Sequence, residues 1–183
     1  MDRRRQIVDA VRPLYLEHPY DDVSAAELAS AAGVARGLIN HYFGSKRELF
    51  VEVMRSTIRM PESELPDLEG LPLPERARRT VAWILDAAET YGAAWLAVSG
   101  AANLHGQSDL QSVVDDADDH AARLTLDALG LPDEAHLRVR LRTVAPLVKA
   151  ICREWLERGT IERPEAVDLL TETILLFVTK ERA

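Results

Sequence analysis

Four residues around position 40 have the types and the spacing to contact bases in DNA. Arg36, Gly37, Asn40 and His41 follow one another at i, i+1, i+4 and i+5, which is one side of a helix, and none of them is a typical core residue. Arginine can donate two hydrogen bonds to guanine, asparagine can pair with adenine, and glycine lets a helix backbone approach a duplex closely. We therefore predict that this face reads base edges in a major groove.

Two short helices and the start of a third must position this face. Ser24 and Glu27 have the S-x-x-E spacing of a capping box, and residues 45–48 repeat that spacing. Gly33 follows the first short helix and Gly44 follows the second, as expected of helix C-terminal caps. The order helix, glycine-containing turn, helix predicts a helix-turn-helix, although an αα-hairpin inside a plain helical bundle has the same outline.

The residues around the reading face are suited to the DNA backbone. Hydroxyl, amine and exposed backbone groups commonly contact phosphate oxygens, and we assign this role to Ser24, Gly37, Tyr42 and Lys46. Leu38 could touch a thymine methyl group or pack in the core. Arg3, Arg4 and Arg5 could form a solvated tail or could reach phosphates.

The same stretch resembles a known family. The run GVARGLINHYFGSKRELF (33–50) resembles the recognition-helix signature of the TetR family of one-component bacterial repressors, and IVDAVRPLYLEHPYDDVSAAELA (7–29) resembles the first two helices of that family. Ala35 stands where the family commonly has a Ser or Thr cap, and Asn40 where it commonly has Tyr. The resemblance implies an all-α, two-domain, dimeric repressor that binds a palindromic operator and is released by a small-molecule effector.

Composition and charge are compatible with local, site-specific DNA binding. The chain has 183 residues, is 47% hydrophobic and carries a formal net charge of -8, which taken alone argues against a nucleic-acid partner. However, residues 1–60 hold 9 Lys/Arg and 8 Asp/Glu, so the acidity belongs to the remainder. The sequence contains no apolar run long enough to span a bilayer and no signal peptide, and Cys152 is its single cysteine. We expect a cytoplasmic protein with no membrane partner.

The chain divides near residue 60. We expect residues 1–60 to form the DNA-binding domain, including the connecting helix that begins at residue 45, and residues 61–183 to form a helical effector-binding and dimerisation domain. Four prolines between residues 61 and 74 mark the boundary. Helices are predicted at about 74–91, 92–105, 108–129, 133–158 and 163–181, and no strand pattern persists. Pro13 should bend or break the first helix of the chain.

Two apolar stripes in the last two predicted helices form a heptad-like seam. In the family that the sequence resembles, the last two helices pair with their copies in a dimer, whereas the same stripes could be the ordinary core of a monomeric bundle. The predicted interface residues are Leu137, Leu141, Val144, Val148, Ile151, Trp155, Val167, Leu170, Ile174 and Phe177.

An aromatic group in the first half of the C-terminal domain is a candidate ligand pocket. Trp83, Tyr91 and Trp95 could line an apolar cavity with Asn103 as a polar handle, and the region corresponds to the effector site of the family that the sequence resembles. Plain core packing would give the same pattern. An apolar or amphipathic small molecule is the expected effector.

No catalytic constellation or cofactor motif is evident in the sequence. Asp115/Asp119 and Asp116/His120 are i, i+4 pairs that could chelate a cation, but no further ligand is fixed by spacing, so we predict a solvated helix face and no metal. We expect no enzyme and no cofactor. The alternative to an effector-gated repressor is a DNA-binding regulator without an effector, acting constitutively or through a protein partner.

Overall fold

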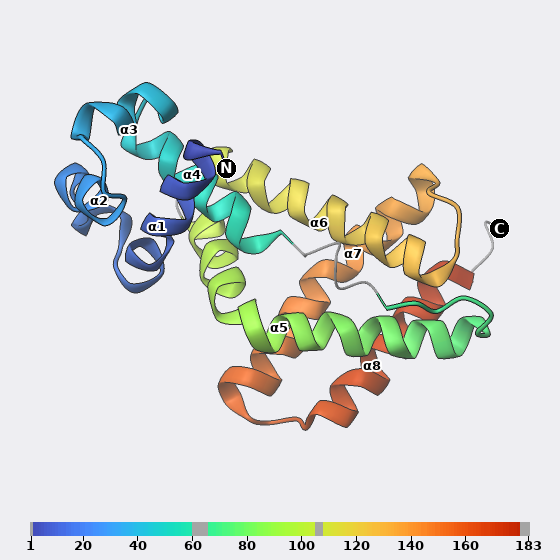
Figure 1. Ribbon diagram of the computed structural model, residues 1–183. Helices are drawn as coiled ribbons and strands as arrows, with labels where there is room; N and C mark the ends of the chain where they lie inside the picture. The colour runs from blue at the N-terminus through green and yellow to red at the C-terminus, as the bar shows by residue number, and fades with distance from the viewer. Residues whose placement is uncertain (1, 60–65, 105–107, 180–183) are drawn as a thin grey trace. The chain divides into compact units, whose positions relative to one another are not determined.

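The protein is all helical in the part that the structure describes (Figure 1). The computed structural model describes residues 2–59, 66–104 and 108–179, and for residues 90–104 and 108 it describes the backbone alone. Packing divides the chain into two compact units, Met1–Ile58 with Val98–Val114, and Arg59–Ala97 with Asp115–Ala183. The first unit thus contains the whole stretch for which DNA binding is predicted, together with a segment from beyond the predicted boundary at residue 60.

The first unit is built on four helices. Helices α1 and α4 pack against each other, α2 packs on α1, and α3 lies against α2 and α4. Their apolar faces meet in a small core that includes Val11, Leu28, Leu49 and Val53, each fully buried. The helices are α1 Arg3–Glu17, α2 Ala25–Ala31, α3 Arg36–Phe43 and α4 Lys46–Ile58, with a 3-10 turn at Tyr20–Asp22.

Local capping explains where the helices of the predicted helix-turn-helix begin and end. The Ser24 side chain accepts from the Glu27 amide at 3.2 Å, and the Glu27 carboxylate accepts from the Ser24 amide at 2.7 Å, which completes the predicted capping box. After α2 the chain turns at Gly33, whose φ of 60° lies in the left-handed region that favours glycine. The predicted helix, turn and helix are therefore present.

Pro13 does not break the first helix. Helix α1 continues through Pro13 to Glu17, and the proline ring is exposed. The ring removes one helical hydrogen bond, but Val11 and Tyr15 on either side are buried in the core and hold the turn in place. Of the two predicted outcomes, a bend or a break, the break does not occur, because tertiary packing outweighs the local cost.

The second unit is a bundle formed by parts of α5 and α6 together with α7 and α8. Helices α7 and α8 form the most extensive helix pair, and the buried core draws on all four helices, as Ala77, Leu126, Cys152 and Leu170 illustrate. The helices are α5 Leu73–Leu104, α6 Ser108–Leu129, α7 Ala135–Cys152 and α8 Arg163–Thr179, and a π-helical turn, Arg153–Arg158, extends α7.

Helix α5 is one helix where the sequence predicted two. The break expected between residues 91 and 92 is absent, and the helix runs without interruption from Leu73 to Leu104. Gly92 keeps its backbone hydrogen bonds in the helix, so it costs only about 1 kcal/mol relative to alanine and does not impose an end. No helix in the described part of the chain is long and apolar enough to cross a membrane.

Candidate DNA-binding surface

The outer face of α3 carries the four residues predicted to read bases. Arg36, Gly37, Asn40 and His41 are all exposed, as is Leu38 at 37%. The opposite face inserts Ile39 and Phe43 into the core, where they are 2% and 5% exposed. A helix of eight residues thus turns one apolar edge inward and presents its polar residues to solvent, as a recognition helix requires.

The predicted backbone-contacting residues lie at the ends of the helices. Ser24 caps α2 and is exposed, and Tyr42 is half-buried at the end of α3, with its ring centroid 5.4 Å from that of His41. Gly44 closes α3 with a φ of 78°. The structure therefore brings Ser24, Gly37 and Tyr42 to the ends and exposed side of the helix-turn-helix.

Lys46 is held differently from the other predicted contacts. Its Nζ donates to the Tyr20 carbonyl oxygen at 2.6 Å and lies 4.2 Å from the centroid of the Tyr20 ring. In this arrangement the amine links the 3-10 turn to the start of α4. A phosphate contact by Lys46 would have to replace or share that hydrogen bond.

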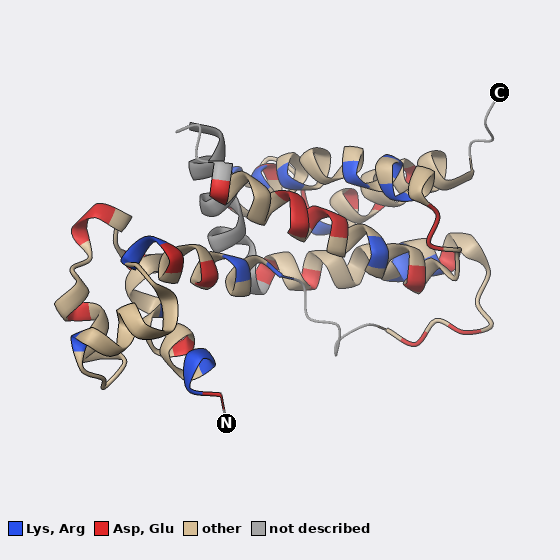
Figure 2. Cartoon of the chain, turned by 90° about the horizontal axis from the view of Figure 1, so that it is seen from above, with Lys and Arg blue, Asp and Glu red and all other residues tan. Residues whose placement is uncertain are grey.

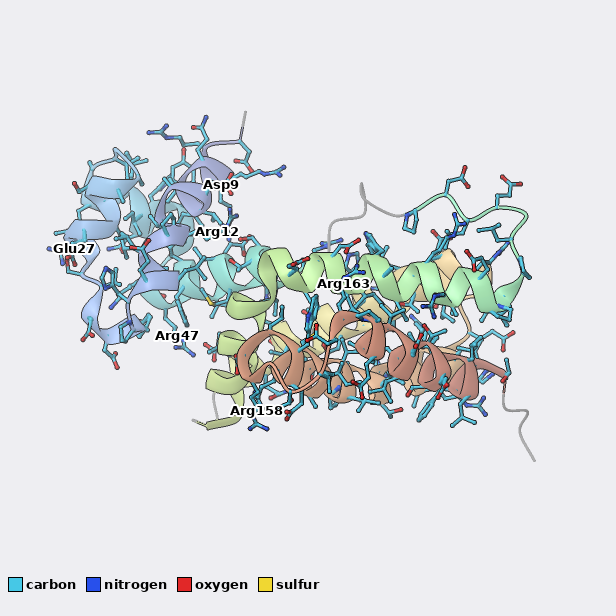
Figure 3. The ribbon with its side chains drawn as sticks, turned by 90° about the horizontal axis from the view of Figure 1, so that it is seen from below. Asp9, Arg12, Glu27, Arg47, Arg158 and Arg163 are labelled. Atoms are coloured by element: carbon cyan, nitrogen blue, oxygen red, sulfur yellow. The ribbon has the colours of Figure 1, made fainter. Side chains whose placement is uncertain are left out.

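An ion pair that the sequence analysis missed joins α4 to the first turn of α6, within the first unit. The Arg47 guanidinium donates two hydrogen bonds to the Asp109 carboxylate, from Nε at 2.7 Å and from Nη2 at 2.8 Å. Its Cζ also lies 5.3 Å from the centroid of the Tyr20 ring and 5.4 Å from that of Phe50 (Figure 3, Arg47 labelled). The hydrogen bond from Arg47 lowers the pKa of Asp109 to about 2. No sequence signal could reveal the pair, because 62 positions separate the partners.

The sequence of the first unit matches a described family. Residues 7–53 match the family model described as bacterial regulatory proteins, tetR family. Over 78 residues the chain is 37% identical to the HTH-type transcriptional regulator BetI of Escherichia coli O127:H6, a match that covers 42% of this chain and 40% of that protein. Residues 7–53 thus form a helix-turn-helix region of the TetR family. The match to BetI spans about two fifths of each protein.

Solved structures extend the TetR likeness to the fold of the whole chain. A tetR-family regulator from Streptomyces coelicolor superimposes with a TM-score of 0.68 at 24% identity, covering 96% of this chain and 78% of that one. FadR of Thermus thermophilus, described as a TetR-family repressor in complex with lauroyl-CoA, gives a TM-score of 0.65 at 18% identity, covering 98% and 97%. These similarities establish the fold of an N-terminal helix-turn-helix domain and a helical C-terminal domain.

Of the four predicted ligand-binding residues, the structure describes the side chain of Trp83. Trp83 on α5 is buried, and its indole N–H has no hydrogen-bond acceptor among the described residues. Tyr91, Trp95 and Asn103 lie on the part of α5 whose side chains are outside the description. Burying an N–H without an acceptor costs free energy, so Trp83 marks a place where a bound acceptor would be favourable.

The residues predicted to form the dimer seam pack inside the protomer. Leu137, Leu141, Val144, Val148 and Ile151 of α7 are all between 3% and 9% exposed and belong to the core of the second unit. Val167, Leu170 and Ile174 of α8 are buried in the same core, and Trp155 and Phe177 pack against it while partly buried. In a single copy of the chain, these side chains are therefore covered mainly by the core of their own unit.

Other apolar side chains remain exposed on α7 and α8. The exposed fractions of these side chains are 50% for Val139, 40% for Leu147, 43% for Leu169 and 58% for Leu176. Leu169 and Leu176 are seven residues apart and so lie on one side of α8.

Two carboxylates of the acidic run of α6, a helix that carries several acidic residues in Figure 2, form ion pairs with basic residues of their own unit. Asp118 accepts from Lys149 Nζ at 2.9 Å, and the two side chains are 17% and 15% exposed. Burial raises the pKa of Asp118 despite this partner. Asp119 pairs with Arg142 at 2.8 Å and with Arg123 at 3.3 Å. The predicted solvated face is therefore wrong for Asp118 and Asp119, because these carboxylates turn toward basic side chains of α7 and α6.

Proposed function

We propose that the protein is a ligand-responsive transcriptional repressor that binds a palindromic DNA operator as a homodimer and is released by a small-molecule effector. The observation that carries the proposal is the outer face of α3. Its polar side chains are exposed on a helix that the first unit holds by its opposite edge, and the surrounding sequence matches the tetR family model. The relatives' description as transcriptional regulators supports a DNA-binding role and argues against an enzyme. A cytoplasmic location would follow from that role.

Base readout is assigned to Arg36, Asn40 and His41, with Ser24, Gly37, Tyr42 and Lys46 on the phosphate backbone. In a dimer, two α3 helices would enter successive major grooves about 34–36 Å apart. Arg36 is the strongest candidate for specificity, because a guanidinium can bind guanine through two hydrogen bonds.

The test of DNA reading compares two arginines of the same unit. Arg36→Ala should lower affinity for a duplex selected by the wild-type protein by about 1–3 kcal/mol and relax the base preference at one position of each half-site. Arg5→Ala removes an equal charge from an exposed position and should keep the base preference. Affinity for the selected duplex and for a scrambled one is measured at several salt concentrations. An unchanged preference in Arg36→Ala would exclude Arg36 from readout.

We propose that the dimer forms through the exposed apolar residues of α7 and α8 and not through the buried stripe. Val139, Leu147, Leu169 and Leu176 supply apolar surface that a second copy would cover. Leu176→Asp should therefore convert the dimer to a monomer without unfolding it, as measured by sedimentation. Leu16→Asp, which alters an exposed leucine of α1, should leave the dimer intact. If wild type and Leu176→Asp sediment with the same mass, the dimer interface does not include Leu176.

The effector is proposed to be an apolar or amphipathic small molecule bound by the second unit. The buried N–H of Trp83 supports a site there, and a protein of the same fold was solved with lauroyl-CoA. Lauroyl-CoA and a diverse compound library are the probes: a ligand should raise the melting temperature and release the selected duplex. Specific DNA binding without any stabilising compound would favour a regulator that acts constitutively or through a protein partner.

We propose that α6 couples effector binding to DNA binding. Its first residues belong to the first unit, where Asp109 binds Arg47, and from Asp115 onward it belongs to the second. A ligand that shifts α6 would change the contact between Asp109 and Arg47 of α4. Because coupling between two binding sites is reciprocal, operator DNA should weaken ligand binding by the same factor by which the ligand weakens DNA binding.

A further inference from the structure

The three arginines that open α1 have different surroundings. Arg3 and Arg5 are exposed, and Arg3 donates to Gln6 on its own helix, at 3.0 Å. Arg4 is half-buried, and its backbone N–H is held by the Asp2 carboxylate at 3.0 Å, which caps α1. The Asp2 cap therefore fixes the backbone at the first turn of α1, the blue segment beside the N-terminus in Figure 2.

The Arg4 side chain reaches across to the end of α3. Its Nη1 donates to the Tyr42 carbonyl oxygen at 2.8 Å, and its Cζ lies 4.7 Å from the centroid of the Phe43 ring. Its Nη2 lies 3.5 Å from Glu52 Oε2 on α4. One guanidinium thus contacts the last turn of α3 and the middle of α4, and we refer to these contacts as the Arg4 clamp.

Helix α3 needs such support at its C-terminal end. It has eight residues, and the Ala35 side chain at its N-cap position makes no hydrogen bond. Helices this short are not stable alone, and their last four carbonyls lack intrahelical partners. A cation that binds one of those carbonyls satisfies it and also complements the negative end of the helix dipole. Helix α1 packs mainly on α2 and α4, so the Arg4 side chain supplies a direct link from α1 to α3.

We propose that Arg4 is a positioning residue for DNA recognition, setting the orientation of α3 through the Arg4 clamp instead of binding a phosphate. The guanidinium donates a hydrogen bond to the Tyr42 carbonyl oxygen and forms an ion pair with Glu52, which leaves the exposed arginines Arg3 and Arg5 as the ones available to the duplex. This role rests on the proposed DNA-binding function. It makes sequence selectivity depend on a residue that contacts no base.

The test compares Arg4→Gln with Arg5→Gln, which remove the same charge from neighbouring positions. Arg4→Gln should weaken binding to the selected duplex about tenfold, and weaken binding to a scrambled duplex no more than Arg5→Gln does. The slope of log affinity against log salt should be the same in Arg4→Gln as in wild type, because Arg4 would contact no phosphate. A slope lower by about one in Arg4→Gln alone would assign Arg4 to a phosphate and overturn the proposal.

A second variant separates geometry from charge. Arg4→Lys keeps the positive charge but cannot place two donors in the planar fork that reaches Tyr42 and Glu52 together. It should bind the selected duplex severalfold less tightly than wild type, with an unchanged salt slope. If Arg4→Lys binds the selected duplex as tightly as wild type, the positive charge alone explains the role of Arg4, and the proposal of the Arg4 clamp is overturned.

Hydrogen exchange in the protein without DNA gives a readout that does not depend on the proposed function. Amide exchange in residues 40–44 should be faster in Arg4→Gln than in Arg5→Gln and wild type. Equal exchange in all three proteins would overturn the clamp. Absence of specific DNA binding by the wild type would overturn the proposed function, and the exchange comparison would then still decide whether Arg4 holds α3.

Discussion

Helices α3 and α8 are stabilised by different means. Helix α8 has 17 residues and buries a continuous apolar stripe that includes Ala166, Leu170 and Ile174. Helix α3 has eight residues, buries only Ile39 and Phe43, and is held at its C-terminal end by a hydrogen bond from Arg4. A helix that must offer one face to a duplex cannot bury that face, so its position depends on contacts from neighbouring elements. Substitutions that remove or add similar numbers of atoms should therefore change stability by different amounts in α3 and in α8.

The largest effect is expected in the core of the second unit. Leu170→Ala removes a side chain that is 0% exposed, and should lower the free energy of unfolding by about 3 kcal/mol through lost burial and the cavity left behind. Urea unfolding at a fixed protein concentration measures this change. Leu16→Ala removes the same atoms from a position that is 47% exposed, and should change stability by less than about 0.5 kcal/mol. Equal losses would contradict the assignment of Leu170 to the core.

A smaller effect in the opposite direction is expected at the start of α3. Ala35 already has the extended backbone of an N-cap, with φ -66° and ψ 142°, but its side chain cannot accept a hydrogen bond. Ala35→Ser should stabilise α3 by about 1 kcal/mol, because the hydroxyl can accept from the amide of Gly37 or Leu38. The measurement is amide hydrogen exchange, which should be slower at Gly37 and Leu38 in Ala35→Ser than in wild type. Ala26→Ser, at an exposed position inside α2, should not slow exchange in α3, and a similar slowing in both variants would contradict the capping explanation.

The smallest effect concerns the ion pair between Arg47 and Asp109. Since the folded pKa of Asp109 is lowered to about 2, the pair stabilises the fold above the ordinary pKa of an aspartate, and that contribution is lost as the pH falls from about 4 to about 2. Asp109 is 42% exposed, so screening by solvent limits the contribution to about 1 kcal/mol at most.

The measurement for this ion pair is the stability difference between wild type and Asp109→Asn as a function of pH. The difference should be constant from pH 7 to about 4 and then shrink. Glu69→Gln, on an exposed residue outside this contact, gives the background expected for loss of a single carboxylate. A difference that grows on acidification would reverse the sign and contradict the pairing.

The sequence predicted the helix-turn-helix in detail because its signals are local. The capping box joins Ser24 to Glu27, three residues away, and Gly33 and Gly44 adopt the positive φ that their positions at helix ends require. The exposed face of α3 also follows from spacing alone, since residues i and i+4 of any helix share a side. These features depend on little beyond the segment itself.

The features that escaped prediction depend on distant segments. The stripe from Leu137 to Ile151 is periodic because it is buried, and periodicity cannot say whether the same chain or a second copy covers it. A break at Pro13 and a boundary between residues 91 and 92 are both absent, and α1 and α5 continue through these positions. For Arg4 the sequence left a solvated tail or a phosphate contact, and it gave Arg47 no role, because only the fold brings these arginines to Tyr42 and Asp109.

The first compact unit is discontinuous in the chain, and this limits how the molecule can be recombined. Met1–Ile58 is completed by Val98–Val114, whose Asp109 is bound by Arg47. A chimaera that joins residues 1–60 to the C-terminal domain of another regulator would lose Asp109, the partner of Arg47. A chimaera that also carries residues 98–114 would keep this ion pair. Exchange of specificity between relatives should therefore succeed more often with two grafted segments than with one.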